Sequence, residues 1–127
     1  MANDKKRILV AEDEDVLRQI YEEELKREGY EVFTARNGKE ALVHLEAYKP
    51  DLIILDIAMP EMSGMEAIGP ILNKNRRIPI ILNTAHPQYQ EDLMSWGADA
   101  YVVKSGDLTD LKNKIRELLG KSDPSWL

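Results

Sequence analysis

The sequence predicts an α/β protein built from a doubly wound, mostly parallel (βα)5 sheet. Short apolar runs alternate with stretches of helical periodicity five times along the chain. Each run is brief, rich in β-branched residues and apolar on both faces, as strands covered by helices on two sides should be. Because parallel strands need crossover connections, and these are right-handed, the alternation predicts helices on both faces of one sheet. Ligands of such sheets bind beyond the carboxyl ends of the strands.

The five apolar runs are the predicted strands. They cover residues 8–11, 31–35, 52–55, 78–83 and 100–103. The third run, Leu52-Ile-Ile-Leu55, is the most apolar, and Asp56 follows it directly. A Pro- and Gly-containing loop comes next, so Asp56 stands where a buried strand reaches the surface.

The first two predicted helices have clear boundaries. The first spans residues 15–28 and ends at Gly29, a usual C-terminal cap. Its predicted inward stripe consists of Val16, Leu17, Ile20, Tyr21 and Leu25. The second helix starts after Asn37, a plausible N-cap, and ends at Pro50.

The remaining three helices are marked by Gly, Pro and capping residues. The third begins near Gly64, but Gly69-Pro70 inside its pattern predicts a kink or a late start, because Pro removes a backbone donor. Pro87 can open the fourth helix. Ser105 or Asp107 can cap the fifth, whose apolar stripe comprises Leu108, Leu111, Ile115, Leu118 and Leu119.

Length and composition bound the class of protein. A chain of 127 residues with 43% apolar content buries one core, and we expect residues 1–121 to form one domain and residues 122–127 a tail or the start of a linker. The net charge of −6 argues against direct nucleic-acid binding. The chain has no Cys, and no apolar stretch approaches membrane-spanning length. These features predict a cytoplasmic protein that does not bind membranes.

Chemically active side chains stand at the predicted carboxyl ends of four strands. They are Glu12 with Asp13, Asp56, Thr84 and Lys104. Any one alone is weak evidence, because an Asp at a strand end most often bonds the backbone of a turn. Together they complete one another chemically. Three clustered carboxylates repel unless they share protons or a cation, and an all-oxygen ligand set suits Mg²⁺.

An oxygen-rich Mg²⁺ site commonly holds a phosphoryl group as well. Lys104 can offer a compact positive charge to one phosphoryl oxygen, and Thr84 can donate a hydroxyl hydrogen bond to another. A carboxylate in this setting can act as the nucleophile, as in aspartyl-phosphate chemistry. We expect that nucleophile to be Asp56, because it follows the middle strand of the proposed set.

The segments that carry these residues resemble the receiver domains of two-component response regulators. The resemblance runs from about Arg7 to Leu119, and its motifs are residues 8–14, 55–64, 83–85 and 97–104. It implies a flavodoxin-like sheet of strand order 2-1-3-4-5, with the site between the first and third strands. It also implies that Asp56 accepts a phosphoryl group from a histidine kinase or a histidine phosphotransfer protein.

The resemblance implies roles for further residues. Mg²⁺ would be held by Asp13, Asp56 and the backbone carbonyl of Ala58, with Glu12 reached through water. Lys104 would contact the phosphoryl group. The residues with the remaining implied roles are Thr84 and Tyr101 as a conformational switch, and Ala58, Ala85 and His86 at the border of the phosphoryl site. The implied output surface is made of residues 88–96, 100–103 and 108–119, and it would serve an unknown partner or downstream domain.

The chain departs from the family pattern after the lysine, where receiver domains usually have Pro and this chain has Ser105. A cis peptide before a non-proline residue costs about 2.5–4 kcal/mol, which favours a trans Lys104-Ser105 bond and a rearranged loop.

The leading interpretation is a signalling phosphoacceptor that catalyses only its own phosphorylation and dephosphorylation. Three alternatives remain. One is a degenerate receiver that acts as a phosphorylation-independent interaction module. Another is an aspartyl-nucleophile phosphatase of the haloacid-dehalogenase type, which usually has a second acid where this chain has Ala58. The last is a flavin-binding protein, although an acidic loop after the first strand repels a flavin phosphate unless a metal intervenes.

Overall fold

The computed structural model describes residues 5–85 and 97–121. These residues form a five-stranded, fully parallel sheet of order β2-β1-β3-β4-β5, so the predicted fold class and strand order are confirmed. The elements are β1 (Arg7–Ala11), α1 (Asp15–Arg27), β2 (Glu31–Ala35), α2 (Gly38–Tyr48), β3 (Leu52–Leu55), α3 (Gly64–Lys74), β4 (Ile80–Thr84), β5 (Ala100–Val103) and α5 (Thr109–Lys121). The predicted fourth helix, His86 and the tail lie outside the described residues.

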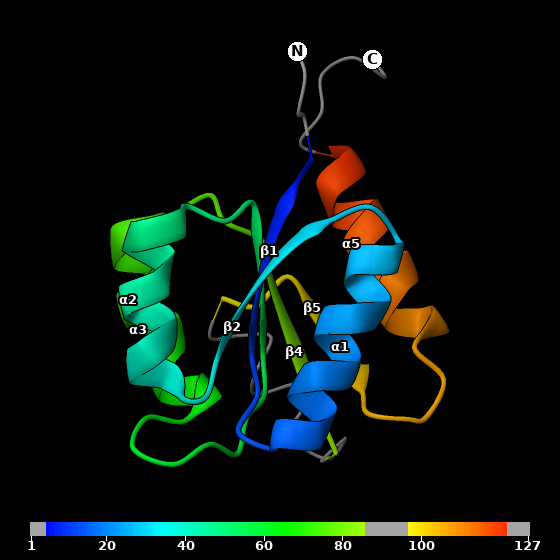
Figure 1. Ribbon diagram of the computed structural model, residues 1–127. Helices are drawn as coiled ribbons and strands as arrows, with labels where there is room; N and C mark the ends of the chain where they lie inside the picture. Colours follow the sequence, from blue (N-terminus) through cyan, green and yellow to red (C-terminus); the bar gives the residue numbers. More distant parts are fainter. Residues whose placement is uncertain (1–4, 86–96, 122–127) are drawn as a thin grey trace.

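Helices cover both faces of the sheet (Figure 1): α2 and α3 lie on one face, and α1 and α5 lie on the other. Alternate residues of each strand supply the two halves of the core. Leu9 and Ala11 of β1 pack in the half beneath α2 and α3. Ile8 and Val10 pack in the half beneath α1 and α5. Two-sided burial explains why the strands read as continuous apolar runs rather than as alternating patterns.

The register of the sheet brings the carboxyl ends of β1 and β3 to the same level. Ala11 pairs with Leu55, and the next amide, that of Asp56, donates to the carbonyl of Ala11 at 3.0 Å. The residues that follow the two strands therefore emerge side by side. This is the point at which the order of the strands reverses, as expected for a ligand site in an open parallel sheet.

The buried stripe of α1 is narrower than the sequence predicts. Tyr21 and Leu25 are buried and Leu17 is partly buried, but Val16 is 71% exposed and Ile20 is 42% exposed. The expectation that all five residues face the sheet is therefore wrong. A helix contacts a nearly flat surface along the i, i+4 line, and Val16 and Ile20 lie beside that line.

Helix α3 begins at Gly64, and the alternative of a late start is wrong. Ser63 and Glu66 form a reciprocal capping box, in which each side chain accepts a hydrogen bond from the other residue's backbone amide. The helix then continues through Pro70 to Lys74. The two hydrogen bonds of the box stabilise the first turn and offset part of the cost of a proline in the interior.

Replacement of Pro70 by alanine should stabilise the protein. Proline costs about 3 kcal/mol relative to alanine within a helix, whereas its rigidity in the unfolded chain returns up to about 1 kcal/mol. We therefore expect the free energy of unfolding to rise by about 1–2 kcal/mol, measured by urea denaturation. Pro60→Ala is the control. Pro60 lies in the loop before α3, so its replacement restores no hydrogen bond within a helix. A lower stability of Pro70→Ala would show that packing of the proline ring outweighs the lost hydrogen bond.

The segment between β5 and α5 is organised by its own polar side chains. Asp107 Oδ1 accepts hydrogen bonds from the amide of Thr109 at 2.9 Å and from its hydroxyl at 2.5 Å. These bonds hold the pKa of Asp107 below its usual value. Ser105 Oγ in turn contacts the amide and carbonyl of Asp107. Of the two predicted caps, Asp107 bonds the first amide of α5, whereas Ser105 bonds only the backbone of Asp107. No peptide bond among the described residues is cis, including Lys104-Ser105.

Within residues 5–85 and 97–121, no helix combines the length and the apolar character that crossing a membrane requires.

Candidate functional site

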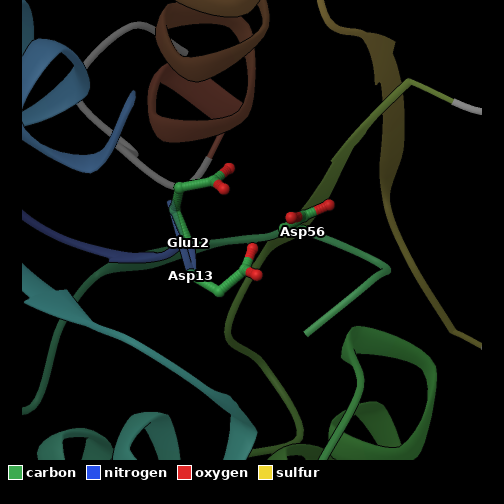
Figure 2. Close-up of side chains that lie close together, drawn as sticks. All are labelled: Glu12, Asp13 and Asp56. Atoms are coloured by element: carbon green, nitrogen blue, oxygen red, sulfur yellow. The ribbon is translucent and has the colours of Figure 1, made fainter. Parts of the chain in front are cut away.

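Three carboxylates converge at the carboxyl ends of β1 and β3. Glu12, Asp13 and Asp56 each offer an oxygen atom, and these atoms all lie within 4.8 Å of one another. Figure 2 shows the three side chains around one shared space, two from the end of β1 and one from the end of β3. Glu12 is 1% exposed and Asp56 is 5% exposed, whereas Asp13 is more accessible. The predicted acidic cluster therefore exists and is open toward solvent on the Asp13 side.

Lys104 joins this cluster from the end of β5. Its Nζ lies 2.8 Å from Glu12 Oε1 and 3.2 Å from Asp56 Oδ2, so one ammonium group bridges two carboxylates. The backbone amide of Lys104 donates to the carbonyl of Thr84 at 2.7 Å, which extends the β4–β5 pairing by one residue. This bond fixes the base of the lysine before Ser105. The missing proline therefore does not prevent the side chain from reaching the site.

Burial and charge pull the ionisation of the cluster in opposite directions. Burial raises the pKa of Glu12 and of Asp56 above the usual carboxyl values, and contact with Lys104 opposes that rise only in part. For Lys104, burial lowers the pKa, but the two carboxylates outweigh it and the pKa ends above its usual value. The ammonium group therefore stays charged at neutral pH, whereas the two buried carboxyl groups lose their negative charge more readily than exposed ones and would gain from a further positive charge.

The composition of the cluster fits a hard divalent cation. Three carboxyl groups face one ammonium group in a largely buried space, so their full ionisation would leave an excess of negative charge that a cation can balance. Within the described residues, Glu12 Oε1 has no partner in hydrogen-bond geometry, although Lys104 Nζ lies 2.8 Å away. All available ligand atoms are oxygens, which is the set that Mg²⁺ prefers.

Gly64 packs directly against the backbone of Asp56. Its amide donates to the carbonyl of Ile57 at 3.0 Å. A Cβ atom added at Gly64 would lie 2.3 Å from the carbonyl oxygen of Asp56, closer than any side chain can approach. The amide of Ala58 also donates to Asp56 Oδ1 at 3.4 Å. The loop after β3 thus wraps around Asp56 and depends on a glycine to do so.

The other predicted residues lie around this cluster. Thr84 is fully buried at the end of β4, paired with Val103 of β5, and Ala85 follows it at the surface. Tyr101 is partly buried and packs against the half of the core beneath α2 and α3. His86 lies outside the described residues. The structure thus joins Lys104 to Glu12 and Asp56 by direct side-chain contact and places Thr84 on the neighbouring strand.

Two features of the site were not predicted from the sequence. Arg18 is not among the residues predicted for the site, but its guanidinium group donates to the carbonyl oxygen of Glu12 at 2.9 Å. Tyr21 is predicted only as a core residue, yet its side chain is hydrogen-bonded to that of Asn83, next to Thr84, and burial raises its pKa. A polar residue next to Thr84 was the available signal for the second feature. No spacing pattern in the sequence indicates that Arg18 contacts the Glu12 backbone.

Comparison with known proteins identifies the family. Residues 8–116 match the family described as the response regulator receiver domain. The chain belongs to this family. The predicted resemblance is therefore confirmed, and the acidic cluster lies where the receiver fold has its strand-order reversal.

Solved structures of receiver domains superpose closely on this one. The response regulator protein TrrA from Thermotoga maritima, in complex with Mg²⁺-BeF, is 50% identical with a TM-score of 0.84, over 89% of this receiver and 98% of that chain. The same protein in complex with the histidine kinase ThkA is 50% identical with a TM-score of 0.82, over 90% of this receiver and 98% of that chain.

Among curated proteins, the probable transcriptional regulator ycf27 of Porphyra purpurea is 39% identical over 125 residues. This match covers 97% of the present receiver but 51% of the relative. The receiver thus spans about half the length of the curated relatives that it matches first.

Proposed function

We propose that this receiver is a phosphoacceptor of a two-component system and that Asp56 takes a phosphoryl group from a histidine kinase or a histidine phosphotransfer protein. The observation that carries the proposal is the position of Lys104 Nζ, 3.2 Å from Asp56 Oδ2, inside a cluster of three carboxylates. The cluster binds a cation, and the lysine binds an anion. A phosphoryl group on Asp56 needs both.

In the proposed reaction, a carboxylate oxygen of Asp56 attacks the phosphorus of a phosphohistidine. The new O–P bond forms as the N–P bond breaks, and the electron pair of that bond returns to the imidazole nitrogen. Lys104 stabilises the negative charge on the phosphoryl oxygens from one side, and the Thr84 hydroxyl does so from a second. Mg²⁺ held by Asp13, Asp56 and the carbonyl of Ala58, with Glu12 reached through water, would offset the remaining negative charge.

The proposed response to phosphorylation passes from Asp56 through β4 to β5, the strand at the edge of the sheet. Thr84 and Tyr101 lie on the neighbouring strands β4 and β5 and would act together as the switch. Ala58, Ala85 and His86 would border the phosphoryl group. The proposed output surface includes β5 and α5, and its partner is another protein or a downstream domain. The curated relatives are named as transcriptional regulators, but this acidic receiver would not itself bind nucleic acid.

The kinase partner is supported by the complex between TrrA and ThkA. A phosphorelay of this kind places the receiver in the cytoplasm, and its chemistry is limited to forming and losing its own phosphoryl group. A degenerate receiver would not need the complete set of three acids, one hydroxyl and one ammonium group. A phosphatase of the haloacid-dehalogenase type is disfavoured because Ala58 occupies the position of its second acid.

Incubation with acetyl phosphate and Mg²⁺, followed by intact mass spectrometry, tests the proposal. The wild type should gain one phosphoryl adduct, chelation of Mg²⁺ should prevent it, and Asp56→Asn should gain none. Asp51→Asn is the matched control, because Asp51 precedes the same strand at its opposite end and accepts a hydrogen bond from the Arg7 amide. An unmodified wild type would favour the degenerate receiver. An adduct that persists in Asp56→Asn would show that the acceptor is another residue.

A further inference from the structure

Arg18 of α1 reaches back across the loop that carries two of the three acids. Its Nη1 donates to the carbonyl oxygen of Glu12 at 2.9 Å and to that of Asp13 at 3.4 Å. Its Nη2 pairs with Asp15 Oδ1. The side chain is only 16% exposed despite its charge. One planar group thus connects three consecutive features of the chain: the end of β1, the acidic loop and the first turn of α1.

The start of α1 lacks a side-chain cap, and Arg18 cannot supply one, because a guanidinium group only donates hydrogen bonds whereas the first amides of a helix need acceptors. Glu14 occupies the N-cap position of α1, but its side chain makes no capping hydrogen bond. Its amide instead donates to Glu12 Oε2 at 3.1 Å. The carbonyl groups that Arg18 holds belong to the same two residues whose carboxylates face Asp56. A rotation of either peptide unit would move its carboxylate away from the shared space, so the guanidinium group restricts the position of both.

The charge of Arg18 and its hydrogen bonds to the loop should affect cation binding in opposite directions. A guanidinium group close to a cation site repels the cation, so its removal should strengthen cation binding if electrostatics dominated. If the fixed geometry of the loop dominates, its removal should weaken binding, because the carboxylates must then be ordered at the moment of binding. The two effects differ in sign, and a measurement of affinity separates them.

We propose that Arg18 is a positioning residue that holds the Glu12-Asp13 backbone in the geometry required for divalent-cation binding. This inference rests on the proposed function, because it assumes that the acidic cluster binds Mg²⁺. Arg18 does not touch the cation or the phosphoryl group in this role. It acts through two carbonyl groups. Groups that orient metal ligands in this way typically contribute 10–100-fold to metal affinity.

The test is calorimetric titration of the full chain with Mg²⁺ at neutral pH. Arg18→Met keeps the length of the side chain but removes its donors, and we expect Mg²⁺ to bind about 10-fold more weakly. Arg18→Lys keeps the charge but cannot span two carbonyl groups, and its affinity should fall between those of Arg18→Met and the wild type. At saturating Mg²⁺, the rate of Asp56 phosphorylation in both variants should return to near the wild-type rate.

Arg27→Met is the matched control. Arg27 lies on the same helix and also pairs with an acid three residues before it, Glu24, but it is 76% exposed and roughly 14 Å farther along α1. Its replacement should leave Mg²⁺ affinity unchanged.

Wild-type affinity or tighter binding in Arg18→Met would overturn the inference: wild-type affinity would show that the loop keeps its geometry without Arg18, and tighter binding would show that charge repulsion dominates. If Arg18→Met does not fold, the Mg²⁺ affinity of Arg18→Lys is the test. Wild-type affinity in Arg18→Lys would then overturn the inference. An absence of Mg²⁺ binding in the wild type would instead overturn the proposed function.

Discussion

Replacement of Lys104 by methionine should destabilise the protein by about 3 kcal/mol near neutral pH in the absence of divalent cations. Lys104 is the ammonium group that contacts two nearly buried carboxylates, those of Glu12 and Asp56. Methionine fills a similar volume but leaves both charges without this partner, and an uncompensated buried charge costs more than a lost surface ion pair. Chemical denaturation of the metal-free protein measures the effect.

The loss should depend on pH in a defined direction. Burial already raises the pKa of both carboxyl groups, and removal of Lys104 raises it further. Ionisation of a carboxyl group whose pKa is raised in the folded state destabilises that state. This cost is largest above the raised pKa, declines as pH falls below it, and is gone below the ordinary carboxyl pKa. The difference between wild type and Lys104→Met should therefore be largest from neutral to mildly alkaline pH and shrink under acidic conditions. The Lys104 contribution itself ends only above the usual lysine pKa, because its pKa is raised in the folded state.

Mg²⁺ should act differently on stability and on function in this variant. A divalent cation can replace the missing positive charge, so Mg²⁺ should stabilise Lys104→Met more than it stabilises the wild type. The rate of phosphorylation should nevertheless fall by about 10²-fold or more, because the ammonium group that meets the phosphoryl oxygens is gone. Lys112→Met is the control, since Lys112 pairs with Glu24 and Glu28 away from the site. An equal loss of stability at acidic and neutral pH would contradict the explanation.

Gly64→Ala should produce a comparable loss of stability, about 3 kcal/mol, through sterics alone. The added methyl group would lie 2.3 Å from the carbonyl oxygen of Asp56 and 3.2 Å from the Cα atom of Ile57, and both are backbone atoms. Backbone cannot rotate away as a flexible side chain can, so either α3 or the strand end must shift. A shift of the strand end displaces Asp56 directly, and a shift of α3 loosens the loop that Gly64 holds against it. Phosphorylation of the folded variant by acetyl phosphate should therefore slow as well, measured by intact mass over time.

Gly120→Ala is the matched substitution for this test. Gly120 lies in the last turn of α5, and a Cβ atom there would meet nothing within 4 Å. Alanine should stabilise that helix by up to about 1 kcal/mol, the opposite sign from Gly64→Ala. Wild-type stability and phosphorylation in Gly64→Ala would show that the loop after β3 yields at little cost and that the close contact does not fix Asp56.

Some features of the site could be predicted from the sequence because they depend on position along single strands. Asp56, Thr84 and Lys104 each follow an apolar run, and a parallel sheet brings the ends of its strands to one edge. The same reasoning predicted the strand boundaries within one or two residues at each strand. It was less successful for α1, where helical periodicity alone suggested five inward residues but the sheet covers a narrower line of the helix.

The fold class, the family motifs and the identity of the acidic, hydroxyl and ammonium groups could therefore be predicted from the chain alone. These features arise from local patterns, which a linear chain displays directly. The three-dimensional arrangement was needed to show that Lys104 reaches Glu12 and Asp56 without a following proline and that Gly64 lies against the Asp56 carbonyl. It was also needed to show that Arg18 binds the backbone of the acidic loop. Each of these depends on distances between segments, which are set by how helices pack on the sheet and not by spacing along the chain.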